Sequence, residues 1–195
     1  MAALWLLLAA ATPAADDGEA RCYTGGAGSG ELTFWGAVED TAFTGRFGDF
    51  SVRYCMAGEK AQDHRIRVQV DLASADSDNR DRDETLKGPE FFHVERHPTA
   101  GWESTAVRRA GDGYAAEGRL TLKGITAPQP IRYGLEPDDE RLVARGRFII
   151  SGDASIDRQR FEVGTGEFAD PEFVRNEVVV EFEVALTAQQ ESPAG

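Results

Sequence analysis

Residues 65–72 read RIRVQVDL and contain the clearest alternation of polar and apolar side chains in the sequence. The apolar residues occupy every second position of this stretch, and they are Ile66, Val68, Val70 and Leu72. A period of two is typical of a β-strand with one buried face, because successive side chains of a strand point to opposite sides. The stretch therefore predicts a strand that turns its apolar side chains toward a core.

The same alternation recurs along the chain on both sides of this strand. Further runs lie at residues 32–38, 50–54, 120–122, 131–135, 148–150 and 178–186. Each run is short and is bounded by Gly, Pro or Asp, which is typical of strands joined by turns. About seven or eight antiparallel strands indicate either two packed sheets or a closed barrel, and periodicity does not choose between them.

Alternation fails in the charged segment 76–92. Asp78 is a candidate N-cap there, and Gly88-Pro89 is a typical stop signal, so the segment predicts a short helix followed by a loop. We interpret residues 124–130 as a turn and the glycine-rich residues 25–30 as a linker.

The N-terminal residues indicate export. Residues 2–11 form an uninterrupted apolar run that is too short to span a bilayer. The run has the length of a signal-peptide apolar region, and Thr12 and Ala14 supply the small residues at −3 and −1 of a cleavage site after Ala14. We expect a signal peptide that directs the chain to the periplasm, the alternative being an N-terminal helix packed on the domain. The expected organisation is a signal peptide at 1–14, an N-terminal arm at 15–29, one domain at 30–188 and a disordered tail at 189–195.

Charge and cysteine content narrow the partners and the compartment. The sequence has 34 Asp and Glu against 21 Lys and Arg, a net charge of −13, which disfavours nucleic acid and anionic membrane surfaces as primary partners. Its two cysteines are Cys22 and Cys55. An even pair in an oxidising compartment predicts a disulfide, with two unrelated thiols as the alternative.

The motifs of common catalytic and metal sites are missing from the sequence. It contains neither a nucleophile elbow nor a phosphate-binding glycine loop. His93 and His97 are four residues apart, as zinc ligands on a helix are, but Val94 and Pro98 favour a loop leading into a strand. The acidic run 76–84 lacks the ligands and turn glycine of a calcium loop. We therefore expect no catalytic residue and no metal.

Residues 70–104, VDLASADSDNRDRDETLKGPEFFHVERHPTAGWES, resemble the signature of the YceI family. Three further segments follow the order of that family, and they are 43–50 (FTGRFGDF), 118–125 (GRLTLKGI) and 156–163 (IDRQRFEV). The matching signature residues are Asp71, Ser74, Asp76, Arg82, Asp83, Leu86, Lys87, Phe91, Phe92, Val94 and Pro98. The sequence departs from the family pattern at His97, where an aromatic residue is usual, and at Glu162, where glycine is frequent.

The resemblance implies an all-β fold, an extended, antiparallel, eight-stranded, lipocalin-like barrel with a short helix and an apolar interior cavity. In the family the cavity holds a polyisoprenoid, as a quinone tail or a prenyl phosphate. The inward faces assigned by alternation contain no His, Cys or carboxylate. The residues expected to line the cavity are Phe34, Ile66, Val68, Val70, Leu122, Phe148, Val180 and Phe182.

Three cationic residues are candidates for a head-group contact at the barrel mouth, and they are Arg82, Lys87 and Arg158. The alternative is that these charges pair with neighbouring carboxylates and pin the helix across the barrel. The expected function is a periplasmic carrier or store for an isoprenoid lipid or quinone, with no other cofactor. Residues 164–170 resemble a subgroup associated with membrane cytochromes b, which leaves an accessory role in electron transfer as one alternative and an enzyme on the same barrel as another.

Overall fold

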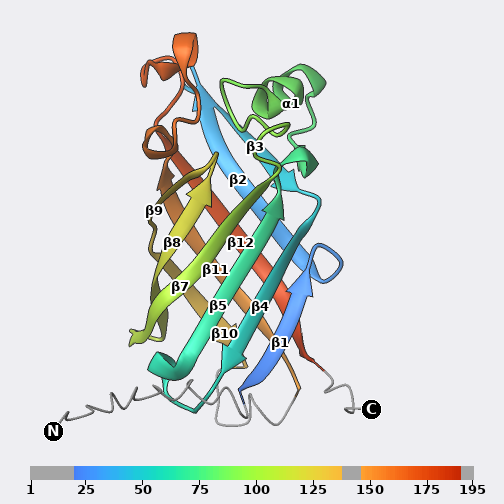
Figure 1. Ribbon diagram of the computed structural model, residues 1–195, viewed down its shortest axis with the longest axis vertical. Helices are drawn as coiled ribbons and strands as arrows, with labels where there is room; N and C mark the ends of the chain where they lie inside the picture. The colour runs from blue at the N-terminus through green and yellow to red at the C-terminus, as the bar shows by residue number, and fades with distance from the viewer. Residues whose placement is uncertain (1–19, 138–145, 190–195) are drawn as a thin grey trace, which may run out of the picture.

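The computed structural model describes residues 20–137 and 146–189 (Figure 1). The expected signal peptide, most of the tail and the start of the arm lie outside these ranges. Within them the strands are β1 (Arg21–Gly26), β2 (Gly30–Val38), β3 (Thr41–Phe47), β4 (Phe50–Met56), β5 (His64–Asp71), β6 (Ala75–Asp76), β7 (Thr99–Ala110), β8 (Gly113–Leu122), β9 (Ile125–Pro128), β10 (Ile131–Glu136), β11 (Arg147–Asp157) and β12 (Glu177–Ala188). The described helical segments are α1 (Arg80–Lys87) and the short 3-10 turns η1 (Ala61–Asp63), η2 (Leu72–Ser74), η3 (Arg158–Phe161) and η4 (Gly166–Ala169).

Eight of the described strands close into an antiparallel barrel. Their order is β1-β4-β5-β7-β8-β10-β11-β12, and β12 pairs again with β1 through Tyr23 opposite Ala188 and Thr24 opposite Thr187. The closed ring excludes the two-sheet sandwich and confirms the predicted barrel.

The two ends of the barrel are built differently. The upper end carries α1 and the segments that contain η3 and η4, whereas the β4–β5 and β7–β8 connections lie at the opposite, lower end (Figure 1). At the upper end β2 leaves β1 and pairs with the first half of β12, and β3 and β6 extend the sheet beyond it. No helix among the described residues is long and apolar enough to cross a membrane.

The N-terminal arm and the glycine linker are corrected by the structure. Residues 21–26 form β1, so the barrel begins at Arg21 rather than at residue 30. A Cβ on Gly25 would lie 2.5 Å from the Ala185 carbonyl oxygen, and one on Gly30 would lie 2.2 Å from that of Glu183. Glycine is therefore required here because β12 approaches the backbone closely, and composition alone suggested flexibility instead.

The predicted helix is present at Arg80–Lys87 and stops at Gly88, but its cap differs from the prediction. The Asn79 side chain accepts a hydrogen bond of 3.0 Å from the Arg82 amide, so Asn79 is the N-cap. Asp78 has a φ of 56°, which is not the extended conformation that a cap residue adopts. The predicted turn at 124–130 also contains a strand, β9, which pairs with β8.

Cys22 and Cys55 stand directly opposite each other on β1 and β4, and they form the predicted disulfide. Their Cα atoms are 4.1 Å apart, and 33 positions separate them in sequence. The bond therefore joins the first strand of the barrel to its neighbour and confirms the pairing.

Replacing both cysteines by serine should lower the free energy of unfolding by ~3–4 kcal/mol, because the unfolded chain then loses a cross-link that closes a loop of this size. Urea denaturation of the oxidised protein and the double variant measures the difference. Thiol titration of the unfolded, unreduced wild type should find no reactive sulfhydryl, and two reactive thiols would contradict the bond.

Candidate functional site

A cavity of about 210 Å³ lies inside the upper half of the barrel. Its walls come from β2, β3, β4, β5, β7, β8, β10, β11 and β12, and Leu86, Phe91 and Phe92 contribute from α1 and the loop that follows it. The lining is aliphatic and aromatic except at Gln129, Arg158 and Arg175. Such a surface offers dispersion and hydrophobic contact to an apolar ligand but few groups that bind polar atoms.

The structure brings most of the residues expected in the cavity together. Those that line it are Phe34, Ile66, Val68, Val70, Leu122, Val180 and Phe182. Phe148 does not line it, because it lies closer to the lower end and packs against the rings of Tyr23 and Tyr54 at 4.8 and 5.5 Å. Alternation identifies the face to which a side chain belongs, but it does not give the height along the barrel.

Several cavity residues were missed by alternation. Trp102 on β7 lines the cavity, and its Nε1 donates a 2.8 Å hydrogen bond to the Gln129 carbonyl. A Cβ on Gly118 of β8 would lie 2.2 Å from the Trp102 ring, so the absence of a side chain there makes room for the indole. β7 gave no clear period because the residues two positions on either side of Trp102, Ala100 and Ser104, are small and the register shifts between Ser104 and Ala106.

Arg158 is a buried structural cation rather than an open charge. Its side chain is 3% exposed and donates four hydrogen bonds of 2.7–3.1 Å to backbone carbonyls, those of Val163, Gly164, Val174 and Arg175. Burial lowers the pKa of Arg158, with Asp157 acting in the opposite direction, but arginine stays protonated. The guanidinium therefore holds together the segments around η3 and β12 at the upper end.

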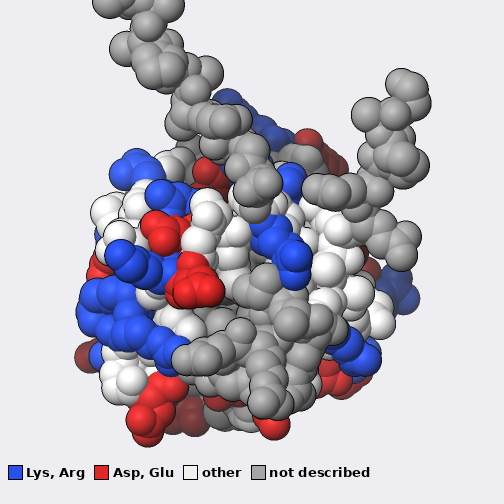
Figure 2. Space-filling view, turned by 90° about the horizontal axis from the view of Figure 1, so that it is seen from below, with Lys and Arg blue, Asp and Glu red and all other residues white. Residues whose placement is uncertain are grey.

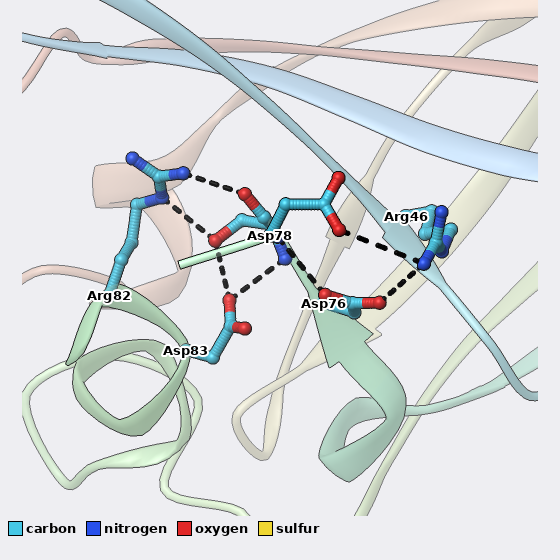
Figure 3. Close-up of polar contacts among 6 residues, drawn as sticks. Arg46, Asp76, Asp78, Arg82 and Asp83 are labelled. Carbon is cyan, nitrogen blue, oxygen red and sulfur yellow. Dashed lines mark hydrogen bonds and ion pairs between the residues drawn. The ribbon is translucent and has the colours of Figure 1, made fainter. Parts of the chain in front are cut away.

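Arg82 is held in a polar cluster with Ser77 and Asp83 (Figure 3). Its Nε and one terminal nitrogen donate to the Ser77 hydroxyl and carbonyl, each at 2.8 Å, and the Ser77 hydroxyl bonds to Asp83. The guanidinium also lies 4.5 Å from the centre of the Phe43 ring, which lines the cavity. Arg82 thus anchors α1.

A second pair in the same region ties β3 to β6. Arg46 donates a 2.7 Å hydrogen bond to Asp76, and the Asp78 amide donates to the same carboxylate at 3.0 Å (Figure 3). The Asp78 amide and then Arg46 hold the pKa of Asp76 below its usual value. Lys87 lies in the last turn of α1 and, like Arg82, is not among the residues that line the cavity.

Arg175 is a cation at the cavity that alternation and motif comparison both missed. It lines the cavity, its side chain is 59% exposed, and its guanidinium lies 4.0 Å from the Asp40 carboxylate. No pattern could have singled it out, because it lies in an irregular segment before β12. An exposed arginine beside an apolar cavity can meet solvent and the polar end of a ligand at once.

The histidine pair does not assemble a metal site in the part of the chain that the structure describes. The rings of His93 and His97 are 5.9 Å apart, and no group of three or more possible ligands forms among the described residues.

A polar cluster lies inside the barrel below the cavity, where none was expected. The Tyr54 hydroxyl bonds to His64 Nδ1 at 2.7 Å and to the Tyr133 hydroxyl at 3.1 Å, and all three residues are buried. His64 is the first residue of β5 and faces inward, two positions before Ile66, so the expectation of an inward face without histidine was wrong. The period of two extends to this position, because His64 precedes Arg65 and lies on the same face as Ile66.

The acidic net charge is not spread evenly over the lower end. Seen from below, Lys and Arg side chains gather on one side of the rim, with Asp and Glu interspersed (Figure 2). The surface of the lower end is therefore not uniformly negative.

Replacing Arg158 by Met should lower the free energy of unfolding by ~3 kcal/mol or more, because four carbonyls lose a charged donor. Arg175→Met is the matched control, and it should change stability by less than ~0.5 kcal/mol because the side chain is exposed. Urea denaturation of both variants gives the comparison. Equal stability of the two variants would show that the Arg158 contacts do not hold the upper end.

Burial lowers the pKa of His64 below 6.5, and this effect exceeds the opposing influence of Asp63 and the Gly58 carbonyl. Below that pH the unfolded chain takes up a proton that the folded protein resists, so stability should fall as the pH drops below about 6.5. The contribution is at most about 1.4 kcal/mol per pH unit. Unfolding free energies measured between neutral pH and about pH 5 should show a shallower slope for His64→Phe than for wild type. Identical slopes would contradict the assignment.

The closed antiparallel barrel with an apolar cavity places the chain in the class of lipocalin-like barrels. Residues 27–186 match the family model of the YceI-like domain, and the chain belongs to that family.

Curated relatives and solved structures agree with this assignment. The "UPF0312 protein" of Serratia proteamaculans is 33% identical over 102 residues, which are 52% of this chain and 50% of the relative. A relative from Yersinia pestis is 36% identical over 84 residues, 43% of this chain and 44% of its own. The chain thus spans about half the length of the curated relatives it matches.

Among solved structures, BcnA of Burkholderia cenocepacia superposes with a TM-score of 0.72 at 24% identity, over 80% of this chain and 95% of its own. A polyisoprenoid binding domain from Saccharophagus degradans superposes with a TM-score of 0.60 at 12% identity, over 88% of this chain and 100% of its own. At these identities the likeness concerns the fold.

Proposed function

We propose that this protein binds the apolar tail of an isoprenoid-type lipid, such as a quinone or a prenyl phosphate, and serves as a periplasmic carrier or store. The observation that carries the proposal is the cavity enclosed by the barrel, whose walls are apolar except at three residues. The structural neighbour from Saccharophagus degradans, described as a polyisoprenoid binding domain, supports the same ligand class.

The energetics of burial are sufficient for retention without a specific polar contact. If ~400 Å² of apolar ligand surface leaves water, the gross gain is about 10 kcal/mol. Ordering the ligand and losing its free motion offset part of this gain. An apolar tail is therefore the kind of ligand that this lining favours, and a strongly polar ligand would lose its hydration without compensation.

The charges suggest which way the ligand lies. Below the cavity the barrel is filled by buried side chains, whereas Arg175 at the upper end is exposed. We infer that the tail enters from the upper end and that a polar head group remains near Arg175. Arg158 is less suited to that role because four of its N–H groups already bond to carbonyls.

The disulfide supports an oxidising compartment such as the periplasm, where such bonds persist. No observation on the described residues favours an enzyme or an accessory to a membrane cytochrome b. The buried His64–Tyr54 pair is not part of the cavity lining, so it does not meet a ligand held there.

Mass spectrometry of an organic extract of the purified protein tests the proposal, and we expect a co-purified isoprenoid. Val68→Asp should abolish most of this retention, because Val68 lines the cavity and a buried, unpaired carboxylate is unfavourable beside an alkyl chain. Gln69→Asp is the matched control on the exposed face of the same strand, and it should retain the lipid.

Circular dichroism must show that the variants fold. The proposal is wrong if wild-type protein extracts empty and binds no added quinone or prenyl phosphate. It is equally wrong if folded Val68→Asp retains the same lipid as wild type.

A further inference from the structure

The cavity ends at the same level on five neighbouring or facing strands. The deepest residues that line it on β4, β5, β10, β11 and β12 are Val52, Ile66, Ile131, Ile150 and Val184. Two positions further toward the lower end, and therefore on the same inward face, lie Tyr54, His64, Tyr133, Phe148 and Leu186. None of these five residues lines the cavity, and each is less than a tenth exposed. We call them the floor layer.

Hydrogen bonds connect three members of the floor layer across the barrel. The Tyr54 hydroxyl lies between His64 Nδ1 at 2.7 Å and the Tyr133 hydroxyl at 3.1 Å. These bonds join β4, β5 and β10, and they hold the Tyr54 side chain in place within the layer. A buried network of this kind resists displacement, because separating its members leaves polar groups without partners.

Ring contacts close the rest of the layer. Phe148 meets Tyr54 edge to face at 5.5 Å and Tyr23 at 4.8 Å, while Tyr114 stacks on Tyr133 at 5.1 Å. The sequence has four tyrosines, and all of them lie in or against this layer. Their concentration at one level contrasts with the aliphatic walls above.

We propose that the floor layer sets the longest isoprenoid tail that the cavity accepts, so that Tyr54 and its neighbours determine chain-length specificity. This inference rests on the proposed function. The bulk of the rings blocks the lower barrel, and the hydrogen bonds with the ring contacts keep them in place. A tail that exceeds the depth above the floor must leave its excess in water at the upper end.

The spacing between inward layers of the barrel can be compared with the length of an isoprene unit. Two residues along a strand span about 6.6 Å, so removing or adding one inward layer changes the depth by roughly the length of one isoprene unit. One such unit left in water should weaken binding by roughly tenfold or more, because several buried carbons are lost. Chain length is therefore a sensitive readout of the floor position.

The experiment measures the affinity of full-length protein for farnesol, geranylgeraniol and geranylfarnesol, each of which is one isoprene unit longer than the one before. Wild type should bind more tightly as the chain lengthens until the cavity is filled, and the gain should then stop. Tyr54→Ala should move this limit to a longer chain. Ile66→Phe should move it to a shorter one, because the added ring fills space that the cavity already provides just above the floor.

Tyr54→Phe is the control for lost hydrogen bonds. This variant should also lower the stability of the protein. It should nevertheless keep the chain-length limit of wild type, because the ring remains packed against Phe148. Ile66→Phe tests the idea even if Tyr54→Ala does not fold, as judged by circular dichroism.

The outcomes separate the two proposals. If wild type binds the prenyl alcohols but folded Ile66→Phe and Tyr54→Ala keep its length limit, the floor does not set chain length and the binding function stands. A limit that moves equally in Tyr54→Phe and Tyr54→Ala would also overturn the role of ring bulk. If wild type binds none of the three alcohols, the proposed function itself fails.

Discussion

The pairing of β12 with three neighbours is the constraint on which the rest of this structure depends. It runs beside β11 along its whole length, while its other edge pairs with β2 near the upper end and with β1 near the lower end. This arrangement closes the barrel, and a closed sheet has no free edge and separates its interior from water. Gly25 and Gly30 are the local condition for it, because any side chain there would collide with the β12 backbone.

Closure leaves two ends that the sheet cannot seal, and polar groups complete them in different ways. At the upper end the chain is irregular, so carbonyls outside the ladder need donors. Arg158 supplies four hydrogen bonds to them, and Lys123 Nζ donates to the carbonyls of Glu162 and Glu90. At the lower end tyrosine hydroxyls and His64 bond to one another inside the barrel. The apolar cavity lies between these two polar regions.

The predicted and observed structures differ where the role of a residue depends on contacts distant in sequence or on its backbone conformation rather than on the local sequence pattern. The alternation in β5 was strong because its side chains point in turn to the barrel interior and to solvent, and the structure confirms the strand. Alternation did not delimit β7, which the sequence predicted only as a strand after Pro98, because the residues two positions on either side of Trp102 are small and the indole fills the space above Gly118. Asp78 satisfied the composition of an N-cap, yet its φ of 56° leaves that role to Asn79. Glu162, where the family resemblance suggested glycine, has a φ of 53° that glycine adopts without strain.

The sequence by itself determined the strand content, the inward faces of most strands, the short helix and the cysteine pair. These properties follow from side-chain periodicity and residue chemistry, which are local. Only the tertiary structure decided that the sheet closes, that the cavity stops above Phe148, and that Arg175 rather than Arg82 borders it. Height along a barrel and the partner of a buried charge depend on strand register and on segments distant in sequence, and no local pattern records them.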